Sequence, residues 1–501
     1  MQRIVKPIPS LRLSLPFYLF RRWVRFGDPI RLFQHLHKTY GNIASYNFMG
    51  RPIIFINDPR YIENVLIHDA HRYVKERTVR RMKILLGEGL ITSEDPLHIR
   101  QRRIVAPAFH RQRIAAYADQ IVAIAAHHRD QWQTGQTPNP VIDIAAASMA
   151  LSLEIVARTL FNTEVTPDIR AINDEVNTIM GLYNYIVAIP RLEELLHLPI
   201  PPLVKFRRSK AHLDSVVSRL IAERRAEIAA HPGSADKGDL LSMLLASTYE
   251  PVDAGGFPLP PTDKPAEHMS DAQIRDEVLT IFLAGYETVA NALSWAWYLI
   301  SQHPEVEAKL HSELDAILGT TKDVSSRPEG APFAPAAEGP ASLPLHPTHR
   351  LPTLADYPNL KYTEQVFAES MRLYPPAWAM GRMCTTGASL GEFNIPPGAY
   401  VFFSQYIMSR TAEFFPDPLR FDPERFTPEA KAARPRFTYF PFGGGSRQCI
   451  GESFAWMEGV LSIATIAQRW RMTYLGRKPP TPQPKITLRP RNPIRMRLTP
   501  R

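Results

Sequence analysis

The spacing of apolar and polar residues changes along the chain and predicts different elements in different regions. Residues 42–48 and 52–56 are short apolar or alternating runs that bracket Gly50, which predicts a β-hairpin. From about residue 97 to 230 apolar positions recur mostly at helical spacing. From Thr473 onward, short alternating runs carry prolines and predict strands and turns. We therefore expect helices to predominate.

The longest helical pattern begins near residue 270. Ser270 and Gln273 form a capping-box pair, which satisfies backbone N–H groups at a helix start. The pattern continues to about Gln302 and stops before Pro304. Apolar or small residues share one side of it, namely Ile274, Val278, Ile281, Phe282, Gly285 and Val289. Because much of this stretch is apolar all round, we expect a buried central helix.

Two segments are rich in residues that break regular structure. Residues 250–268, rich in proline and glycine, predict a loop before the central helix. Residues 319–352, rich in proline, alanine and serine, predict a flexible surface insertion. We do not expect this insertion to be a domain linker, because motifs on both sides of it belong together. The prediction is one domain over residues 1–501.

The net charge of +10 suits nucleic acid, an anionic membrane or an acidic protein partner. No lysine-rich run or basic stretch interleaved with aromatic residues stands out, so we predict no nucleic-acid binding. The apolar stretch 11–20 is short, is interrupted by Pro16 and lacks a signal-peptide cleavage pattern. We therefore predict no transmembrane anchor and expect this stretch to pack on the core.

The chain has two cysteines, Cys384 and Cys449, far apart in sequence. Two cysteines in so long a chain do not suggest a disulfide framework, which indicates a reducing compartment and a cytoplasmic location. The plain interpretation of Cys384 is a small buried apolar side chain.

Cys449 lies in the most informative segment, residues 441–451, where three consecutive glycines precede it and a helical pattern follows. This order places a thiol at a helix N-terminus, where N–H groups and the helix dipole favour a thiolate. Glycines such as Gly443 let the backbone approach a flat ligand closely. A phosphate-binding loop is excluded because no GK[ST] occurs here. A nucleophilic cysteine would need a histidine base, and none is marked out nearby.

The segment resembles the haem-binding signature of the cytochrome P450 family, F-x-x-G-x-R-x-C-x-G. All five fixed positions are filled, by Phe442, Gly445, Arg447, Cys449 and Gly451. The resemblance implies haem b with Cys449 as the axial ligand of its iron, and a thiolate ligand favours O–O cleavage. It also implies a mainly α fold with small β-sheets, with the haem between the long central helix and the cysteine-led helix.

The central helix carries a second match, to the family's A-G-x-[DE]-T. Ala284 and Gly285 begin the motif, and Glu287 and Thr288 end it. The resemblance implies that Gly285 lets the helix open beside the haem, that Thr288 holds activated oxygen by hydrogen bonds, and that Glu287 relays protons. The alternative is a small-residue packing patch whose threonine bonds back along its own helix.

Glu369 and Arg372 match the family's E-x-x-R, and Arg425 falls in its PERF segment. A spacing of three puts the first two side chains on one helix face. The resemblance implies a buried structural charge network behind the haem loop. Many family members carry a histidine where this chain has Ser409, before Arg410, and we expect looser local packing there.

Three residues match haem-propionate contacts of the family, and the position of a fourth suits the same role. His98 and Arg102 fit an H-x-x-x-R pattern, and Arg382 follows a Pro-Pro pair. Arg447, two residues before the cysteine, is placed to pair with a carboxylate of the same ligand. The alternative for the first three is ordinary surface charge.

The resemblance also indicates which segments line the substrate cavity. We expect Ile91 in the loop 87–93, the central-helix residues Thr280, Leu283 and Ala284, and the later residues Ala377, Ala379 and Met380. Because they are uncharged and mostly apolar, an apolar substrate is expected. Ordinary core packing remains an equal alternative for each of them.

The resemblance implies a monooxygenase that inserts one oxygen atom from O2 into an apolar organic substrate, such as a fatty acid or a terpenoid. No flavin segment follows residue 501, so we expect electrons from a separate ferredoxin or flavodoxin with its NAD(P)H reductase. A basic chain suits an acidic electron donor. An isomerase or a peroxide-driven enzyme would need no external electrons, but Glu287 and Thr288 argue against the isomerase. A non-catalytic haem sensor is disfavoured because no signalling or DNA-binding domain stands out.

Overall fold

The computed structural model describes residues 6–11, 28–48, 50–133, 139–163, 174–176, 178–179, 181–182, 192–231, 239–249, 267–319 and 350–501. The expected loop at 250–268 lies outside them up to residue 266, as does the expected insertion from 320 to 349. Residues 12–20 of the apolar N-terminal stretch also lie outside them.

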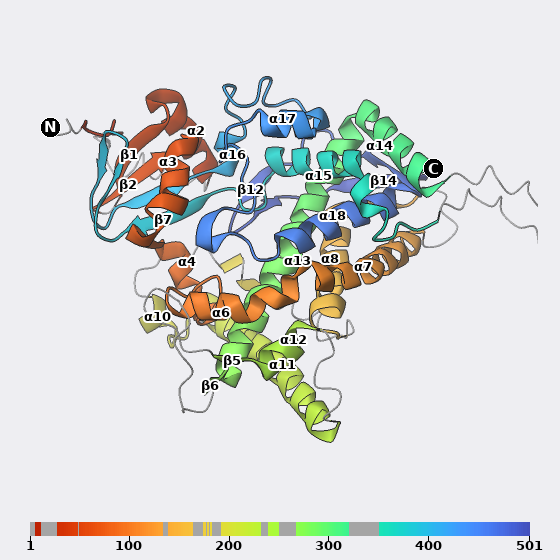
Figure 1. The fold of residues 1–501 in the computed structure, drawn as a ribbon, viewed down its shortest axis with the longest axis horizontal. Helices are drawn as coiled ribbons and strands as arrows, with labels where there is room; N and C mark the ends of the chain where they lie inside the picture. The colour runs from red at the N-terminus through yellow and green to blue at the C-terminus, as the bar shows by residue number, and fades with distance from the viewer. Residues whose placement is uncertain are drawn as a thin grey trace, which may run out of the picture.

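Helices make up most of the described chain and surround one long central helix (Figure 1). They are α2 (Pro29–Tyr40), α3 (Pro59–Glu63), α4 (Arg77–Arg81), α5 (Lys83–Leu86), α6 (Leu97–Val105), α7 (Arg111–Gln131), α8 (Ile144–Leu160), α10 (Leu192–Leu195), α11 (Pro201–Ala230), α12 (Leu240–Ala246), α13 (Asp271–Gln302), α14 (Pro304–Leu318), α15 (Lys361–Leu373), α16 (Gln405–Met408), α17 (Pro428–Ala432) and α18 (Glu452–Ala467).

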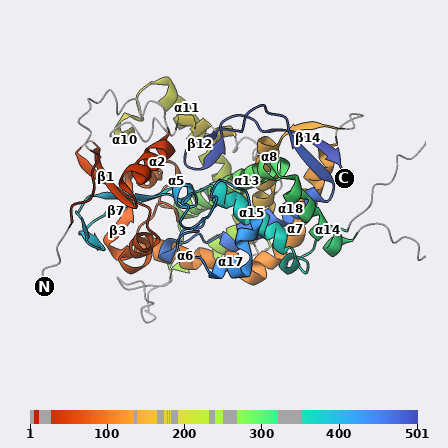
Figure 2. The ribbon, with the colours of Figure 1, turned by 90° about the horizontal axis from the view of Figure 1, so that it is seen from above.

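The strands are short and form small sheets. They are β1 (Ile43–Phe48), β2 (Arg51–Ile56), β3 (Tyr73–Lys75), β4 (Val141–Asp143), β5 (Thr248–Tyr249), β6 (Glu267–His268), β7 (Met380–Cys384), β8 (Ala388–Leu390), β9 (Phe393–Ile395), β10 (Tyr400–Phe403), β11 (Trp470–Tyr474), β12 (Pro482–Pro484), β13 (Leu488–Pro490) and β14 (Arg495–Pro500). The largest sheet has the order β1-β2-β10-β7-β3. It lies at one end of the molecule, and the helices around α13 fill the rest (Figure 2).

Several sequence predictions are confirmed. Strands β1 and β2 pair antiparallel as the expected hairpin, with Phe48 opposite Arg51 next to the turn. The region after Thr473 contains strands and turns. The chain is mainly helical with small sheets, as expected. None of the helices in the described ranges is long and apolar enough to cross a membrane.

Helix α13 organises the core. It starts at the expected capping box, in which Ser270 and Gln273 bond to each other's backbone N–H. It packs against α8, α11, α15 and α18, and its C-terminal half is buried on every side. Trp295 of this helix stacks on Tyr374 with ring centroids 4.0 Å apart. Because neighbours cover α13 all round, residues on different faces of it reach several elements at once.

Candidate functional site

The cysteine loop depends on its three glycines for three different reasons. Gly443 and Gly445 have φ of +75° and +74°, a region that side chains rarely adopt. A Cβ on Gly445 would also overlap the carbonyl oxygen of Leu66. Gly444 has an extended backbone, but a Cβ there would lie 2.6 Å from the ring of Phe437. The loop therefore follows a path that other residues could not take.

This path leads to Cys449, whose backbone N–H donates to the carbonyl of Phe442 at 2.9 Å. The cysteine is exposed, and helix α18 begins three residues later, after Gly451 as its N-cap. Desolvation raises the pKa of the Cys449 thiol to about 11, although the Gly451 N–H acts in the opposite direction. The expected stabilisation of a thiolate by the helix N-terminus is therefore outweighed in the chain alone, and a bound metal cation would supply it.

Helix α13 has a gap in its otherwise buried surface. From Glu277 to Ile300 every residue is buried except Ala284, Gly285 and Thr288. These three lie within about one turn and share a face, because they are spaced by one, three and four residues. We call them the α13 window. A partly accessible patch in the middle of a buried helix indicates an interior cavity, and the patch coincides with the A-G-x-E-T motif.

Thr288 and Gly285 show local contacts that the sequence left open. The Thr288 hydroxyl donates to the carbonyl of Ala284 at 2.7 Å, which is the back-bonded arrangement of the alternative interpretation. Its oxygen still has lone pairs that can accept a hydrogen bond. A Cβ on Gly285 would lie 3.0 Å from Val156 of α8. The helix continues through Gly285 without a break, so the expected local opening is not present in this structure.

Glu287 contacts a distant strand rather than the window. It is buried, and its Oε1 accepts from Arg489 Nε of β13 at 2.8 Å and also from the hydroxyl of Thr487. Asn291, one turn further along α13, bonds to both the Glu287 carbonyl and the Thr487 hydroxyl. The acid of the motif is thus held by a polar network between α13 and the β12–β13 hairpin. Sequence reasoning missed Arg489, since its pattern there indicated only strands and turns.

The predicted cations lie close to one another, near the cysteine. Arg102 Nη1 donates to the carbonyl of Gln448 at 2.7 Å. Arg447 donates to Glu94 and Asp95, each at 3.0 Å, so it pairs with carboxylates of the protein itself. His98 Nδ1 lies 3.4 Å from Asp95, and burial lowers the pKa of this histidine.

Arg382 has a neighbour that the sequence analysis did not single out, Lys75. The two residues are directly opposite each other on the antiparallel strands β3 and β7. Burial, and then the like charge of Arg447, lower the pKa of Arg382 to about 10 and that of Lys75 to about 7. Like charges directly across a strand pair destabilise each other. The site is therefore suited to an additional anionic group, such as a carboxylate of a ligand.

The expected substrate residues divide into two groups. Thr280 and Leu283 are buried, and Gly89 of the loop 87–93 packs against Thr280 so closely that a Cβ would overlap its hydroxyl. The others are half-buried, namely Ile91, Ala284, Ala377, Ala379 and Met380. A Cβ on Gly443 would lie 3.4 Å from the Met380 methyl carbon, so this side chain reaches the cysteine loop. The half-buried residues are therefore the better candidates for lining a cavity.

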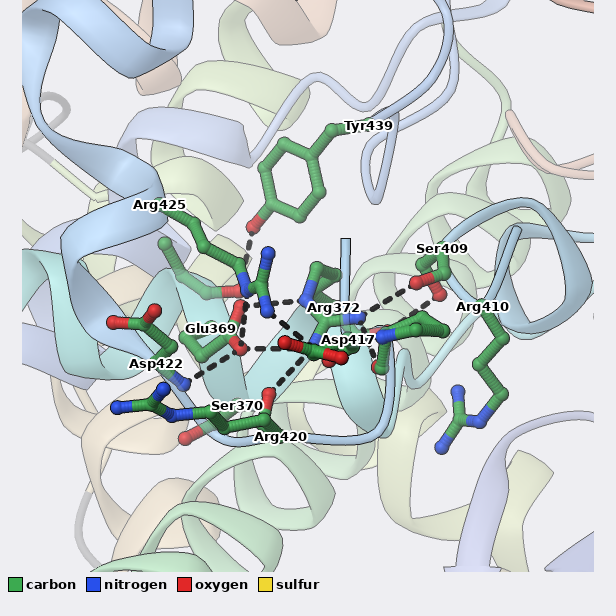
Figure 3. Close-up of polar contacts among 12 residues, drawn as sticks. Glu369, Ser370, Arg372, Ser409, Arg410, Asp417, Arg420, Asp422, Arg425 and Tyr439 are labelled. Atoms are coloured by element: carbon green, nitrogen blue, oxygen red, sulfur yellow. Dashed lines mark hydrogen bonds and ion pairs between the residues drawn. The ribbon is translucent and has the colours of Figure 1, made fainter. Parts of the chain in front are cut away.

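The E-x-x-R pair is at the centre of a buried network (Figure 3). Arg372 donates to Glu369 through Nε at 2.6 Å and Nη2 at 2.8 Å, and both side chains are fully buried. Its guanidinium also donates to the carbonyls of Ser409, Pro418 and Arg420 at 2.6, 2.8 and 3.1 Å. Glu369 Oε1 accepts from the Asp422 backbone N–H at 2.9 Å. The pair thus holds together α15, the segment 409–422 and the start of the PERF segment.

Two further residues join this network. Arg425 Nε lies 3.6 Å from Glu369 Oε1, as expected for the PERF arginine (Figure 3). The Ser409 hydroxyl donates to the carbonyl of Arg372 at 2.6 Å, so the two residues bond to each other in both directions. Ser409 is buried. The looser packing that we expected at this position is therefore not observed.

The comparisons with known proteins identify the family. A sequence model described as "Cytochrome P450" matches residues 9–335 and 341–498. The chain belongs to the cytochrome P450 family. This P450 is 35% identical over 467 residues to cyclooctatin synthase of Streptomyces melanosporofaciens, which covers 92% of this chain and 90% of that protein. It is 31% identical to pentalenene oxygenase of Streptomyces avermitilis, over 84% of this chain and 82% of that protein.

Solved structures share the fold of this P450. The crystal structure of the cytochrome P450DA heme domain superimposes with a TM-score of 0.80 at 22% identity, covering 100% of this chain and 99% of that one. Family membership makes the protein a haem-thiolate monooxygenase. The residues present fit a haem: an accessible cysteine, a partly accessible patch on α13 and opposed cations that suit the propionates.

Proposed function

We propose that this P450 inserts one oxygen atom from O2 into an apolar terpenoid skeleton, using electrons from a separate redox partner. Cyclooctatin synthase, cyclooctat-9-en-7-ol 5-monooxygenase and pentalenene oxygenase, at 35%, 34% and 31% identity, are terpenoid oxygenases and support this substrate class. The observation that carries the proposal is the α13 window, because it is the one partly accessible patch between Glu277 and Ile300 and its three residues all belong to the A-G-x-E-T motif.

The chain's own residues have distinct roles in this proposal. Cys449 provides the thiolate ligand, and Phe442, Gly443 and Gly451 shape the loop around it. A haem bound to a thiolate activates O2 for insertion into a substrate bond. His98, Arg102 and Arg382 hold the propionate carboxylates. Arg447 adds positive charge near the propionates. It also binds Glu94 and Asp95, the two residues that directly follow the loop 87–93.

The residues of the A-G-x-E-T motif bind oxygen and transfer protons. Thr288 accepts or donates a hydrogen bond at the reacting centre when its hydroxyl turns away from the Ala284 carbonyl. Ala284 and Gly285 leave room beside it, since neither has a side chain larger than a methyl group. Glu287 supplies or relays protons, and Arg489 holds its carboxylate in one place.

The substrate contacts are mostly apolar. Ile91, Leu283, Ala377, Ala379 and Met380 offer no charge, which suits a hydrocarbon skeleton. Thr280 has a buried hydroxyl oxygen without a hydrogen-bond partner within the described residues. In this proposal that hydroxyl orients an oxygenated substrate or an ordered water near the cavity.

The electron donor is a ferredoxin or flavodoxin with its NAD(P)H reductase. The net charge of +10 favours encounter with an acidic donor. We place the protein in the cytoplasm, and both of its cysteines are free, as a reducing compartment requires. Product formation that does not change with ionic strength would exclude electrostatic attraction of the donor.

The experiment is an optical titration of the ferric protein with terpenoids, fatty acids and aromatic compounds. A saturable shift of the Soret band toward the high-spin form with terpenoids, and conversion to an oxygenated product with NAD(P)H and redox partners, is the expected result. A shift with fatty acids alone would overturn the substrate class. Cys449→Ala should abolish the red-shifted ferrous-CO band, and Cys384→Ala, the matched control, should retain it. Thr288→Ala should uncouple electron use from product formation.

A further inference from the structure

The loop 87–93 is bound by two buried ionisable side chains that the reaction described above does not use. Lys75 Nζ donates to the carbonyls of Leu90 at 3.1 Å and Ser93 at 2.5 Å. On the other side, the Leu90 N–H donates to Glu277 Oε2 at 3.1 Å. The backbone carbonyl and N–H of Leu90 are therefore both hydrogen-bonded to ionisable side chains, one from β3 and one from α13.

We propose that Lys75 and Glu277 are a positioning pair that holds Ile91 at a set height over the cofactor and so determines the size of the molecule that reaches the reacting centre. Ile91 follows Leu90 directly and precedes Ser93, so it lies between the two points that Lys75 binds. This inference rests on the proposed function, because it assigns the substrate-contact role to Ile91.

The cost of burying these groups argues against an incidental contact. Glu277 is fully buried and Lys75 is 8% exposed. Burying an ionisable group is expensive unless it is paired or becomes neutral. Desolvation raises the pKa of Glu277 to about 8 and lowers that of Lys75 to about 7. An ordinary loop could be held by uncharged side chains at lower cost.

The surroundings of the two groups are mixed in charge. Lys75 faces the cations Arg447 and Arg382 and the carboxylates Glu94 and Asp95. Glu277 faces Asp276 and Lys75 itself. The second carboxyl oxygen of Glu277, Oε1, has no hydrogen-bond partner among the described residues. The Leu90 peptide is therefore the main hydrogen-bond partner of the Glu277 side chain in this structure.

Neighbouring contacts show that the loop lies directly on α13. The Glu88 N–H donates to Asp276 Oδ2 at 2.8 Å. A Cβ on Gly89 would lie 2.6 Å from the carbonyl of Asp276 and would overlap the Thr280 hydroxyl. Because the backbone is this close to the helix, a small displacement of Leu90 changes the position of Ile91 relative to the α13 window.

The test compares Lys75→Met and Glu277→Leu with two controls in the haem-loaded protein. Glu277→Gln keeps an oxygen that accepts the Leu90 N–H and should behave like the wild type. Lys83→Met removes the exposed ion pair to Glu88 of the same loop and should also behave like the wild type. The probes are imidazole and 4-phenylimidazole, which bind haem iron and differ in bulk. Their dissociation constants are read from the Soret shift, and hydrogen–deuterium exchange of the peptide covering residues 84–95 is measured in parallel.

We expect Lys75→Met and Glu277→Leu to increase exchange in this peptide and to change the ratio of the two dissociation constants by roughly tenfold. Lys75→Met removes two hydrogen bonds to the loop and Glu277→Leu removes one, all of them to buried groups. In an Ile91→Ala background the same changes should leave the ratio unaltered, because the side chain through which they act is gone. If Glu277→Leu does not fold, Lys75→Met carries the same prediction.

Wild-type exchange and an unchanged ratio in both variants would overturn the inference while leaving the proposed function intact. A wild-type protein that shows no red-shifted ferrous-CO band and no imidazole shift would instead refute the proposed function itself. A changed ratio that persists in the Ile91→Ala background would overturn the role of Ile91.

Discussion

Glu287 of α13, which is buried, and Arg489 of β13, which is half-buried, form an ion pair with 2.8 Å between Oε1 and Nε. The two residues are 202 positions apart in the chain. The Thr487 hydroxyl donates to the Glu287 carboxylate, and the Asn291 side-chain amide donates to the Thr487 hydroxyl. The acid of the A-G-x-E-T motif is therefore attached to the C-terminal hairpin, and its position depends on how that hairpin packs.

Removal of Arg489 tests this pair. Arg489→Leu leaves the Glu287 carboxylate buried without its cation, and breaking a buried pair costs about 3–5 kcal/mol. We expect the free energy of unfolding in urea to fall by that amount. Arg491→Leu, two residues further along and exposed, should change it by less than about 0.5 kcal/mol. Equal effects of the two substitutions would mean that the ion pair contributes little.

The network around Arg372 should not tolerate a lysine. Arg372 makes bonds in several directions at once, to Glu369 and to three backbone carbonyls. A lysine has a single ammonium group and cannot reproduce this planar arrangement. We expect Arg372→Lys to lose most of the folded, haem-binding protein, measured by the ferrous-CO band per mass of protein. Arg420→Lys, at an exposed position beside it, should retain the band.

Substitution of two glycines with left-handed backbones can distinguish the cost of backbone strain from the cost of steric overlap. Gly445 and Gly398 have φ of +74° and +79°. A Cβ on Gly445 overlaps the carbonyl of Leu66, whereas a Cβ on Gly398 meets nothing within 4 Å. Gly398→Ala should lower stability by about 1 kcal/mol. Gly445→Ala should lower it by clearly more and reduce haem incorporation, as thermal unfolding and the Soret absorbance would show. Equal losses would contradict the steric argument.

The ends of the segment 320–349 are joined by Arg350. Its Nη2 donates to the carbonyl of Ile317 at the end of α14 at 3.0 Å, and both terminal nitrogens pair with Asp356. We expect a short Gly-Ser linker in place of 320–349 to leave haem content and melting temperature nearly unchanged, since loop length has a weak effect on stability. Loss of haem in this variant would show that the segment belongs to the folded domain.

Glu458 of α18 predicts how stability depends on pH. Burial raises its pKa to about 8. Below about pH 4.5 the carboxyl is protonated in both the folded and the unfolded chain, so its ionisation does not reduce the free energy of unfolding. As the pH rises toward 8 the unfolded chain releases the proton first, and stability falls by up to about 1.4 kcal/mol per pH unit. Glu458→Gln should reduce this slope in urea titrations between pH 5 and 8, and an unchanged slope would refute the assignment.

Part of the site could be predicted because its residues are neighbours in the chain. The glycines before Cys449 were recognised from an unbroken segment, and the Ser270 capping box from a spacing of three. The pairing of Glu369 with Arg372 likewise follows from the helix repeat. Ser409 shows the limit of this reasoning, because its bonds to Arg372 join residues 37 positions apart. The sequence showed a serine in place of a histidine but not the bonds that join this serine to Arg372.

The sequence by itself determined the family and the helical character of the chain and predicted the cysteine ligand, since these depend on local motifs and on backbone preferences. Only the tertiary structure decided which charges face each other. Lys75 opposes Arg382 across a strand pair, and Arg489 reaches Glu287 from a hairpin near the C-terminus. Electrostatic and hydrogen-bond partners are set by distances of a few ångströms in the folded chain, and such distances between remote residues have no counterpart in residue order.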